Sequence, residues 1–141
     1  MNTADQYLRA IYLVQLRDQG SAATGKLADA LGVSPASVNE MVGKLEADGL
    51  VEHEKYQGTT LTGEGKQRAR EVLQTYCILE RFLVNVLDVE AYREEATTLE
   101  SVIDETVAER LDTIIDRPAE CPECFDVEAG RCTYLEPPTA D

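Results

Sequence analysis

Three of the four cysteines in this 141-residue chain lie within twelve residues, at a spacing that suits metal chemistry. Cys121, Cys124 and Cys132 form a C-x2-C-x7-C pattern. Two intervening residues allow two thiolates from one tight turn to meet one metal or one cluster edge, and Gly130 allows the loop to fold back toward the third. In a chain expected to be cytosolic, this spacing favours metal ligation over a disulfide.

Several interpretations of these thiols are open. Four thiolates suit an iron–sulfur cluster or a structural Zn²⁺ and are too soft for Mn²⁺. Redox-paired or uncoordinated thiols are the third interpretation. The fourth cysteine, Cys77, is either the fourth ligand, from its own or the partner helix, or a small buried core residue, the usual fate of a helical cysteine. The spacing alone does not separate these alternatives.

Charge divides the chain into two unequal halves. The formal net charge is −14, from 27 acidic and 13 basic residues. Residues 1–70 carry 8 Lys/Arg and 9 Asp/Glu, a net charge of −1, whereas residues 71–141 carry 5 and 18, a net charge of −13. Only the first half is therefore expected to lie against nucleic-acid phosphates. Because only 4 basic residues are lysines, the composition favours a halophile, with an ordinary acidic protein as the alternative.

Length and hydropathy set the broad class. Hydrophobic residues make up 43% of the sequence, enough to fill the core of one compact unit or two small subdomains. No apolar run approaches the ~20 residues that cross a bilayer, and no leader-like segment opens the chain. We therefore expect a cytoplasmic protein with no membrane partner.

The first half of the chain has the apolar spacing of three helices followed by a hairpin. Thr24 and Ser34 are expected to cap the second and third helices, Pro35 suits a first helical turn, and Gly32 ends the second helix. The helices are expected over 3–19, 25–31 and 35–48, and the strands over 50–54 and 59–62 with Gly58 in the turn. This order of elements is a winged helix-turn-helix.

After the hairpin the pattern returns to helix. An apolar stripe predicts a long amphipathic helix from about Glu64 to Val86. Such a stripe usually buries against a second copy of the chain, and packing within the monomer is the alternative. More helix is expected over 89–115, with a break near Ile103. The predicted fold is mainly α, with a winged helix-turn-helix domain over 1–63, a helical dimerisation domain over 64–118 and a Cys-rich tail over 119–141.

The start of the third helix has the small polar side chains that a recognition helix needs in the major groove. Serine hydroxyls suit phosphate contacts, Asn39 suits a base edge, and the Ala36 methyl suits a thymine methyl. A solvated polar helix face is the alternative for this helix considered alone. The candidate DNA-binding residues are Ser34, Pro35, Ala36, Ser37, Asn39 and Glu40, with Lys26, Lys44 and Lys55 approaching the DNA backbone from neighbouring positions.

In this order, the motifs resemble the metal-dependent repressors of the diphtheria toxin repressor and manganese transport regulator family. The resemblance rests on YLRAIYL (7–13), LADALGVSPASVNEMVGKLEADGLVE (27–52), LTGEGKQRA (61–69), LERFLVNVL (79–87) and EEATTLESVIDETVAERLD (94–112). It implies a short two-domain repressor of metal- or iron-homeostasis genes. It further implies a homodimer on a palindromic double-stranded DNA operator, with a divalent metal as corepressor.

Most of the positions that hold metal in this family carry other residues here. The resemblance places them at Gln6, Arg9, Tyr76, Glu80, Arg93, Thr97, Glu100 and Ser101. Only Glu80 and Glu100 keep a usual ligand, so the expected residual Fe²⁺ or Mn²⁺ site is weak. The single histidine, His53, falls on the wing, where a solvated strand residue is more usual than a ligand or a pH switch.

The sequence thus predicts a DNA-binding regulator that senses iron through a cluster held by Cys77, Cys121, Cys124 and Cys132. The alternative is a winged-helix regulator with a structural four-cysteine zinc site that responds to divalent metal or another signal. A small redox or electron-transfer protein is a remoter alternative, because the cysteine pair does not open a helix. With one histidine and no phosphate-binding glycine loop, the chain is not expected to be an enzyme.

Overall fold

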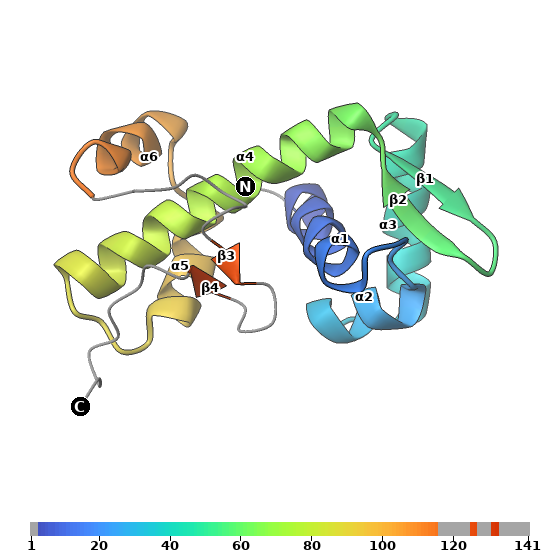
Figure 1. Ribbon diagram of the computed structural model, residues 1–141, viewed down its shortest axis with the longest axis horizontal. Helices are drawn as coiled ribbons and strands as arrows, with labels where there is room; N and C mark the ends of the chain where they lie inside the picture. The colour runs from blue at the N-terminus through green and yellow to red at the C-terminus, as the bar shows by residue number, and fades with distance from the viewer. Residues whose placement is uncertain (1–2, 116–124, 127–130, 133–141) are drawn as a thin grey trace. The chain divides into compact units, whose positions relative to one another are not determined.

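The computed structural model describes residues 3–115, 125–126 and 131–132, with side chains over 3–115. Its elements follow the order α1, α2, α3, β1, β2, α4, η1, α5, α6, β3, β4 (Figure 1). They form an N-terminal unit, Asn2–Val72, and a C-terminal unit, Leu73–Asp141, and α4 (Gly63–Arg81) contributes to both. Helices with one small hairpin wing confirm the predicted mainly α fold.

Three helices build the core of the N-terminal unit: α1 (Thr3–Asp18), α2 (Thr24–Leu31) and α3 (Pro35–Ala47). Their apolar side chains recur every three or four residues, so each helix turns one stripe inward. The buried members are Tyr7, Leu8, Ile11 and Val14 on α1, Leu27 and Ala28 on α2, and Val38, Val42 and Leu45 on α3. The apolar residues whose three- and four-residue spacing predicted these helices therefore supply the buried side chains of the core.

The caps between α2 and α3 set the turn of the helix-turn-helix. Gly32 closes α2 in the left-handed region at φ 66°, and Ser34 caps α3 by accepting a hydrogen bond from the Ser37 N–H at 3.1 Å. Both features confirm the prediction. The expected N-cap at Thr24 is wrong by one residue, because the extended residue before α2 is Ala23, which has no side-chain oxygen to cap the helix.

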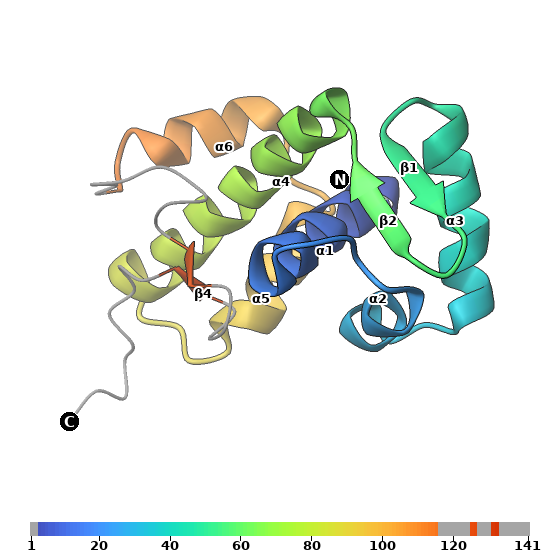
Figure 2. The ribbon, with the colours of Figure 1, turned by 45° about the vertical axis from the view of Figure 1, so that its right-hand side comes forward.

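The wing is the antiparallel hairpin of β1 (Val51–Glu54) and β2 (Gly58–Leu61), with Val51 opposite Leu61. β1 begins one residue later than expected, at Val51. β2 lies one residue earlier than expected, because Gly58, which was expected in the turn, pairs with Glu54 and begins the strand. β1 lies beside α3 and β2 beside α1 (Figure 2). Ala22 forms an isolated antiparallel bridge to Thr59, beside the two-stranded wing sheet.

Close backbone contacts anchor the first turns of α4 within the N-terminal unit. The Thr62 hydroxyl donates to the Gly49 carbonyl at 2.8 Å and accepts from the Gly65 N–H at 3.1 Å. A Cβ at Gly65 would overlap the Leu50 carbonyl oxygen, so this approach requires glycine. Farther along, Arg68 donates from Nε and Nη2 to the two carboxylate oxygens of Asp5 on α1, at 3.0 and 3.3 Å.

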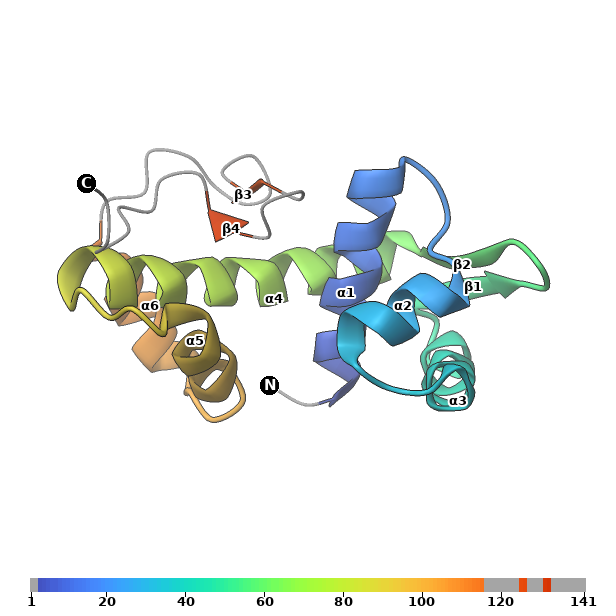
Figure 3. The same cartoon turned by 90° about the horizontal axis from the view of Figure 1, so that it is seen from below.

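The C-terminal unit holds the end of α4, η1 (Phe82–Val86), α5 (Tyr92–Glu100) and α6 (Glu105–Asp112). The predicted long helix changes to π-helical hydrogen bonding at Phe82, and the loop that follows leads into α5, which packs against η1 (Figure 3). The break expected near Ile103 falls over 101–104. There Asp104 caps α6 by accepting from the Thr106 N–H at 2.8 Å.

Two short strands lie in the cysteine-bearing segment. β3 (Phe125–Asp126) and β4 (Arg131–Cys132) are antiparallel, with Phe125 opposite Cys132. The other positions of the predicted tail lie outside the described residues. Within the part of the chain that the structure describes, no helix is both long enough and apolar enough to span a bilayer.

Candidate nucleic-acid interface and metal-ligand positions

The first turn of α3 is held by its own serines. The Ser34 hydroxyl accepts from the Ser37 N–H at 3.1 Å and donates to the Ser37 hydroxyl oxygen at 3.0 Å. Because Ser37 is the acceptor of that second bond, its own hydroxyl hydrogen can point to an outside oxygen. The cap therefore presents a hydrogen-bond donor where a phosphate approaches a recognition helix.

The outer surface of α3 carries the predicted DNA-binding residues together. All of them are exposed: Ser34, Pro35, Ala36, Ser37, Asn39, Glu40 and Lys44. Val38, Val42 and Leu45 between them are buried in the core. The helix thus combines an apolar inner face with a polar outer end, the arrangement that lets a helix enter a groove while its domain stays folded.

The three lysines expected to reach the DNA backbone each lie beside another side chain. The Lys26 Nζ is 2.7 Å from Asp18 Oδ2, and the Lys44 Nζ is 4.0 Å from Glu40 Oε1. The third, Lys55, places its Nζ 5.2 Å from the centroid of the adjacent tyrosine ring. Only the first contact is a short hydrogen bond, and it holds the pKa of Asp18 below its ordinary value of 3.8.

The wing and the start of α2 enclose a surface pocket of about 320 Å³ lined by Thr24, His53, Lys55, Tyr56 and Gln57, among others. Its tip residue, Tyr56, is 94% exposed and has a positive φ of 69°. His53 Nδ1 lies 3.0 Å from the Thr59 hydroxyl oxygen on the facing strand. The half-buried His53 ring thus pairs with a residue across the hairpin, as expected for an ordinary strand residue.

Most of the divalent-metal positions implied by the family carry side chains that are not metal ligands here. Among the described residues, no group of three or more His, Cys, Asp or Glu side chains lies close enough to hold one. Glu80 and Glu100 are buried, at 0% and 1% exposure. The Thr97 hydroxyl donates to the Arg93 carbonyl at 2.8 Å, and the Ser101 hydroxyl donates to the backbone three residues earlier at 2.7 Å. These hydroxyls serve their own helix.

The cysteine positions are only partly described. Cys77 is fully buried on α4, which supports its interpretation as a core residue. Cys132 lies in β4, and its side chain is outside the description, as are Cys121 and Cys124 altogether. The four-thiolate site therefore stays a prediction.

Three contacts of the N-terminal unit were not expected from the sequence. They are the ion pair of Asp18 with Lys26, the pairing of Asp5 with Arg68, and the bond from the His53 N–H to Glu46 Oε2 at 3.0 Å. Each joins residues across a turn or between elements, with no fixed sequence interval. Periodicity gives no signal for such pairs.

A helix-turn-helix with an exposed polar third helix, a hairpin wing and a further helical unit defines the winged-helix class of DNA-binding proteins. Residues 1–59 match the family model for the iron-dependent repressor N-terminal DNA-binding domain, and residues 62–125 match the model for its metal-binding and dimerisation domain. The chain belongs to the iron-dependent repressor family, which confirms the resemblance drawn from its motifs. Both models describe parts of a transcriptional regulator rather than an enzyme.

Individual relatives support the same assignment. An uncharacterised HTH-type transcriptional regulator of Methanocaldococcus jannaschii is 33% identical over 115 residues, 80% of this chain and 92% of that protein. The HTH-type transcriptional regulator MntR of Lysinibacillus sphaericus is 39% identical over 79 residues, 56% of each chain.

Solved structures agree on the fold. The manganese regulator SloR superposes with a TM-score of 0.68 at 33% identity, over 80% of this chain and 53% of SloR. The metal-dependent transcriptional regulator MtsR gives a TM-score of 0.77 at 26% identity, over 89% of this chain and 59% of MtsR. The matched part of this chain thus spans little more than half the length of several of these relatives.

Proposed function

We propose that this chain is a transcriptional regulator, a repressor, that binds double-stranded DNA through α3 and the wing. The observation that carries the proposal is the exposed, serine-capped first turn of α3. Asn39, which follows this turn, is exposed, as are Lys26 on α2, Lys44 on α3 and Lys55 at the wing. The relatives named as HTH-type transcriptional regulators support it.

The regulator acts as a homodimer on a palindromic operator of iron- or metal-homeostasis genes. Support comes from the match to a dimerisation domain and from large apolar side chains that are exposed on the C-terminal unit. They are Val86, Leu87, Val102, Val107 and Ile114. A palindromic operator would offer two half-sites about one DNA turn apart, ~34 Å, one for the recognition helix of each copy.

We also propose that the sensing site is built from thiolates, because most of the family's divalent positions carry other residues here and only Glu80 and Glu100 keep a usual ligand, for a weak Fe²⁺ or Mn²⁺ site at most. Cys121, Cys124, Cys132 and Cys77 would hold an iron–sulfur cluster, and a structural Zn²⁺ on the same thiolates is the alternative. The register of β3 and β4 supports a compact site, because Cys132 pairs with Phe125, the residue bonded directly to Cys124.

The DNA-binding proposal is tested by selecting duplexes from a random pool with the full chain and measuring Kd for the enriched sequence. Asn39→Ala is expected to weaken binding to that sequence by about tenfold and to change binding to random duplex little, because the lost contact is to a base edge. The matched control is Asn85→Ala, an exposed asparagine of the C-terminal unit, which should leave both affinities unchanged. Failure to enrich any duplex would refute the proposal.

The thiolate proposal is tested on protein purified without oxygen or chelator, in high salt, by measuring iron, zinc and acid-labile sulfide. Iron with sulfide and a broad visible absorbance supports the cluster, and stoichiometric zinc without colour supports the structural alternative. Cys124→Ser should then abolish the cofactor and the response of DNA binding to iron. A variant that binds the enriched duplex with the same iron response would remove the sensing role.

A further inference from the structure

One carboxylate at the α1–α2 junction is shared by two cations. Asp18 Oδ2 lies 2.7 Å from the Lys26 Nζ, and Asp18 Oδ1 lies 3.2 Å from the Arg17 Nε. The hydrogen bond from Lys26 is the main reason that the pKa of Asp18 is lowered. The carboxylate is therefore charged at neutral pH, and each of its oxygens accepts one charge-assisted hydrogen bond.

This arrangement is the one that the same two cations would form with a phosphate. A phosphodiester also offers two anionic oxygens, and Arg and Lys are the side chains that bind them in proteins. Arg17 and Lys26 line a surface pocket of about 320 Å³ with Asp29 and Ala30, so an anion can approach them from solvent. In the absence of nucleic acid, the Asp18 carboxylate thus accepts the hydrogen bonds that Arg17 and Lys26 would donate to a phosphate.

The ion pairs of Asp18 are exposed enough for a DNA phosphate to replace the carboxylate. The side chains of Lys26 and Arg17 are 53% and 45% exposed, and exposed ion pairs are weak and readily broken. Among the three lysines assigned to the DNA backbone, Lys26 is the one held by a short bond to a carboxylate, since Lys44 is 4.0 Å from Glu40. Competition between a carboxylate of the chain and a DNA phosphate is therefore expected chiefly at Lys26.

The junction is attached to the wing. The Ser21 hydroxyl donates to the Gln57 carbonyl at 2.7 Å, and Ala22 bridges to Thr59. Lys26 lies in the first turn of α2, directly after this attachment, and Thr24 lines the pocket that also contains Lys55 of the wing. A DNA backbone that contacts the wing and α2 would therefore reach Lys26.

We propose that Asp18 is an internal competitor of DNA phosphate, which lowers the affinity of the chain for duplex of any sequence. The inference rests on the proposed DNA-binding function and adds a determinant of overall affinity to it. A phosphate contact carries no sequence information, because every duplex offers the same backbone oxygens. The competition therefore lowers the affinity for specific and random duplex alike.

The test compares Asp18→Asn with Asp29→Asn in the full chain. Both variants remove one negative charge from the same pocket region, but only the first removes the partner of Lys26. The probe is a random-sequence duplex of roughly 30 base pairs, titrated by fluorescence anisotropy over a range of salt concentrations. We expect Asp18→Asn to tighten binding roughly three- to fivefold and to steepen the salt dependence by about one counterion. Asp29→Asn should change Kd by less than about twofold.

Two further variants protect the interpretation. Asp18→Ala should reproduce the gain, which guards against a misfolded asparagine variant, and circular dichroism checks both. In a Lys26→Gln background the gain from Asp18→Asn should shrink, because the released cation is then absent. Equal effects of Asp18→Asn and Asp29→Asn, or an undiminished gain in the Lys26→Gln background, would overturn the inference. Failure of the unmodified chain to enrich any duplex would instead overturn the proposed function.

Discussion

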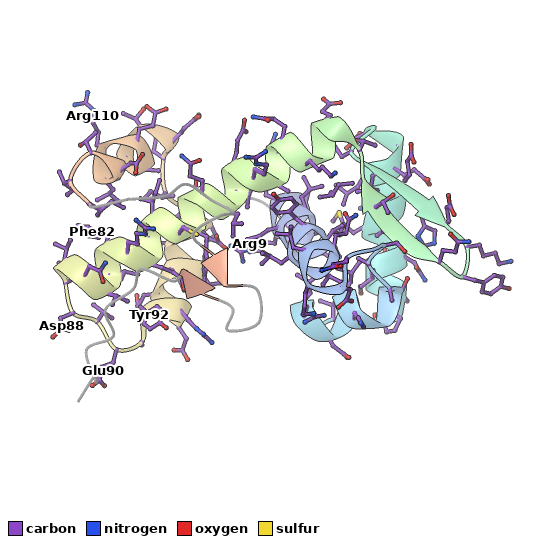
Figure 4. The ribbon with its side chains drawn as sticks, in the orientation of Figure 1. Arg9, Phe82, Asp88, Glu90, Tyr92 and Arg110 are labelled. Atoms are coloured by element: carbon purple, nitrogen blue, oxygen red, sulfur yellow. The ribbon has the colours of Figure 1, made fainter. Side chains whose placement is uncertain are left out.

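The two units of this chain differ in net charge and in where their charged side chains lie. Residues 1–70, nearly all of the N-terminal unit, have a net charge of −1, and their ion pairs lie at the surface or at its edge. Residues 71–141 have a net charge of −13. The C-terminal unit exposes acids such as Asp88 and Glu90 in the loop after η1 (Figure 4) and buries Glu80, Arg81 and Glu100.

The difference indicates how an acidic protein can still bind a polyanion. Repulsion from the C-terminal unit opposes DNA contact everywhere except at a near-neutral surface. The winged unit does not compensate with a positive excess, because the 8 basic residues of positions 1–70 are outnumbered by 9 acidic ones. We therefore expect binding to be confined to the surface formed by α3, the start of α2 and the wing. The predictions below separate what belongs to each unit.

The largest effect is expected from Gly65→Val. A Cβ there would overlap the Leu50 carbonyl, a backbone atom that cannot move without disturbing the wing. We expect the N-terminal unit to lose about 3 kcal/mol of unfolding free energy. Urea unfolding followed by circular dichroism measures it. Gly43→Ala on the open side of α3 is the control and should gain about 0.5–1 kcal/mol. Equal stability of the two variants would contradict the close approach.

A smaller loss is expected from Arg68→Gln. This change removes the guanidinium that donates two hydrogen bonds to Asp5, a carboxylate that is only 7% exposed. Because Arg68 itself is half exposed, we expect a loss of about 1 kcal/mol. Arg70→Gln removes the same charge from the same helix, where no ion pair is seen among the described residues, and should stay within about 0.5 kcal/mol. Indistinguishable midpoints in urea would show that the pair does not anchor α4.

Neutralising acids in the two units should affect DNA binding unequally. The double change Glu52→Gln and Glu54→Gln on β1 is expected to tighten binding to random duplex by roughly fivefold, because these exposed charges lie on the wing. The double change Asp88→Asn and Glu90→Gln removes the same charge from the C-terminal unit and should give less than about twofold. Equal gains in anisotropy titrations would mean that net charge alone sets the affinity.

The smallest effect concerns pH. Since the pKa of Asp18 is lowered chiefly by the hydrogen bond from Lys26, the pair contributes stability above pH 3.8 and loses it as the pH falls through the lowered pKa. A carboxyl-carbon NMR titration should place the Asp18 midpoint below 3.8. In Lys26→Met, the midpoint should move back toward the ordinary value. A midpoint that does not respond to that change would assign the shift to another group.

The sequence predicts the elements of this fold well because their signals are local. The Ser34 cap, Pro35 in the first turn, the left-handed Gly32 and the break before α6 are each decided within a few residues. The switch to π-helix at Phe82 was missed, because an i to i+5 bond leaves the apolar stripe nearly unchanged. The site is predicted less completely. Exposure of Asn39 follows from helical spacing, but the partner of Lys26 depends on how α1 and α2 meet.

The wing sheet also has both of its outer edges occupied. Ala22 bridges to Thr59 along β2, and on β1 the His53 N–H donates to the Glu46 carboxylate, between the exposed charges of Glu52 and Glu54. An exposed strand edge is a template for pairing with another chain, and charged or covered edges prevent it. The wing therefore offers little free strand edge for strand exchange or fibre growth in a crowded cell.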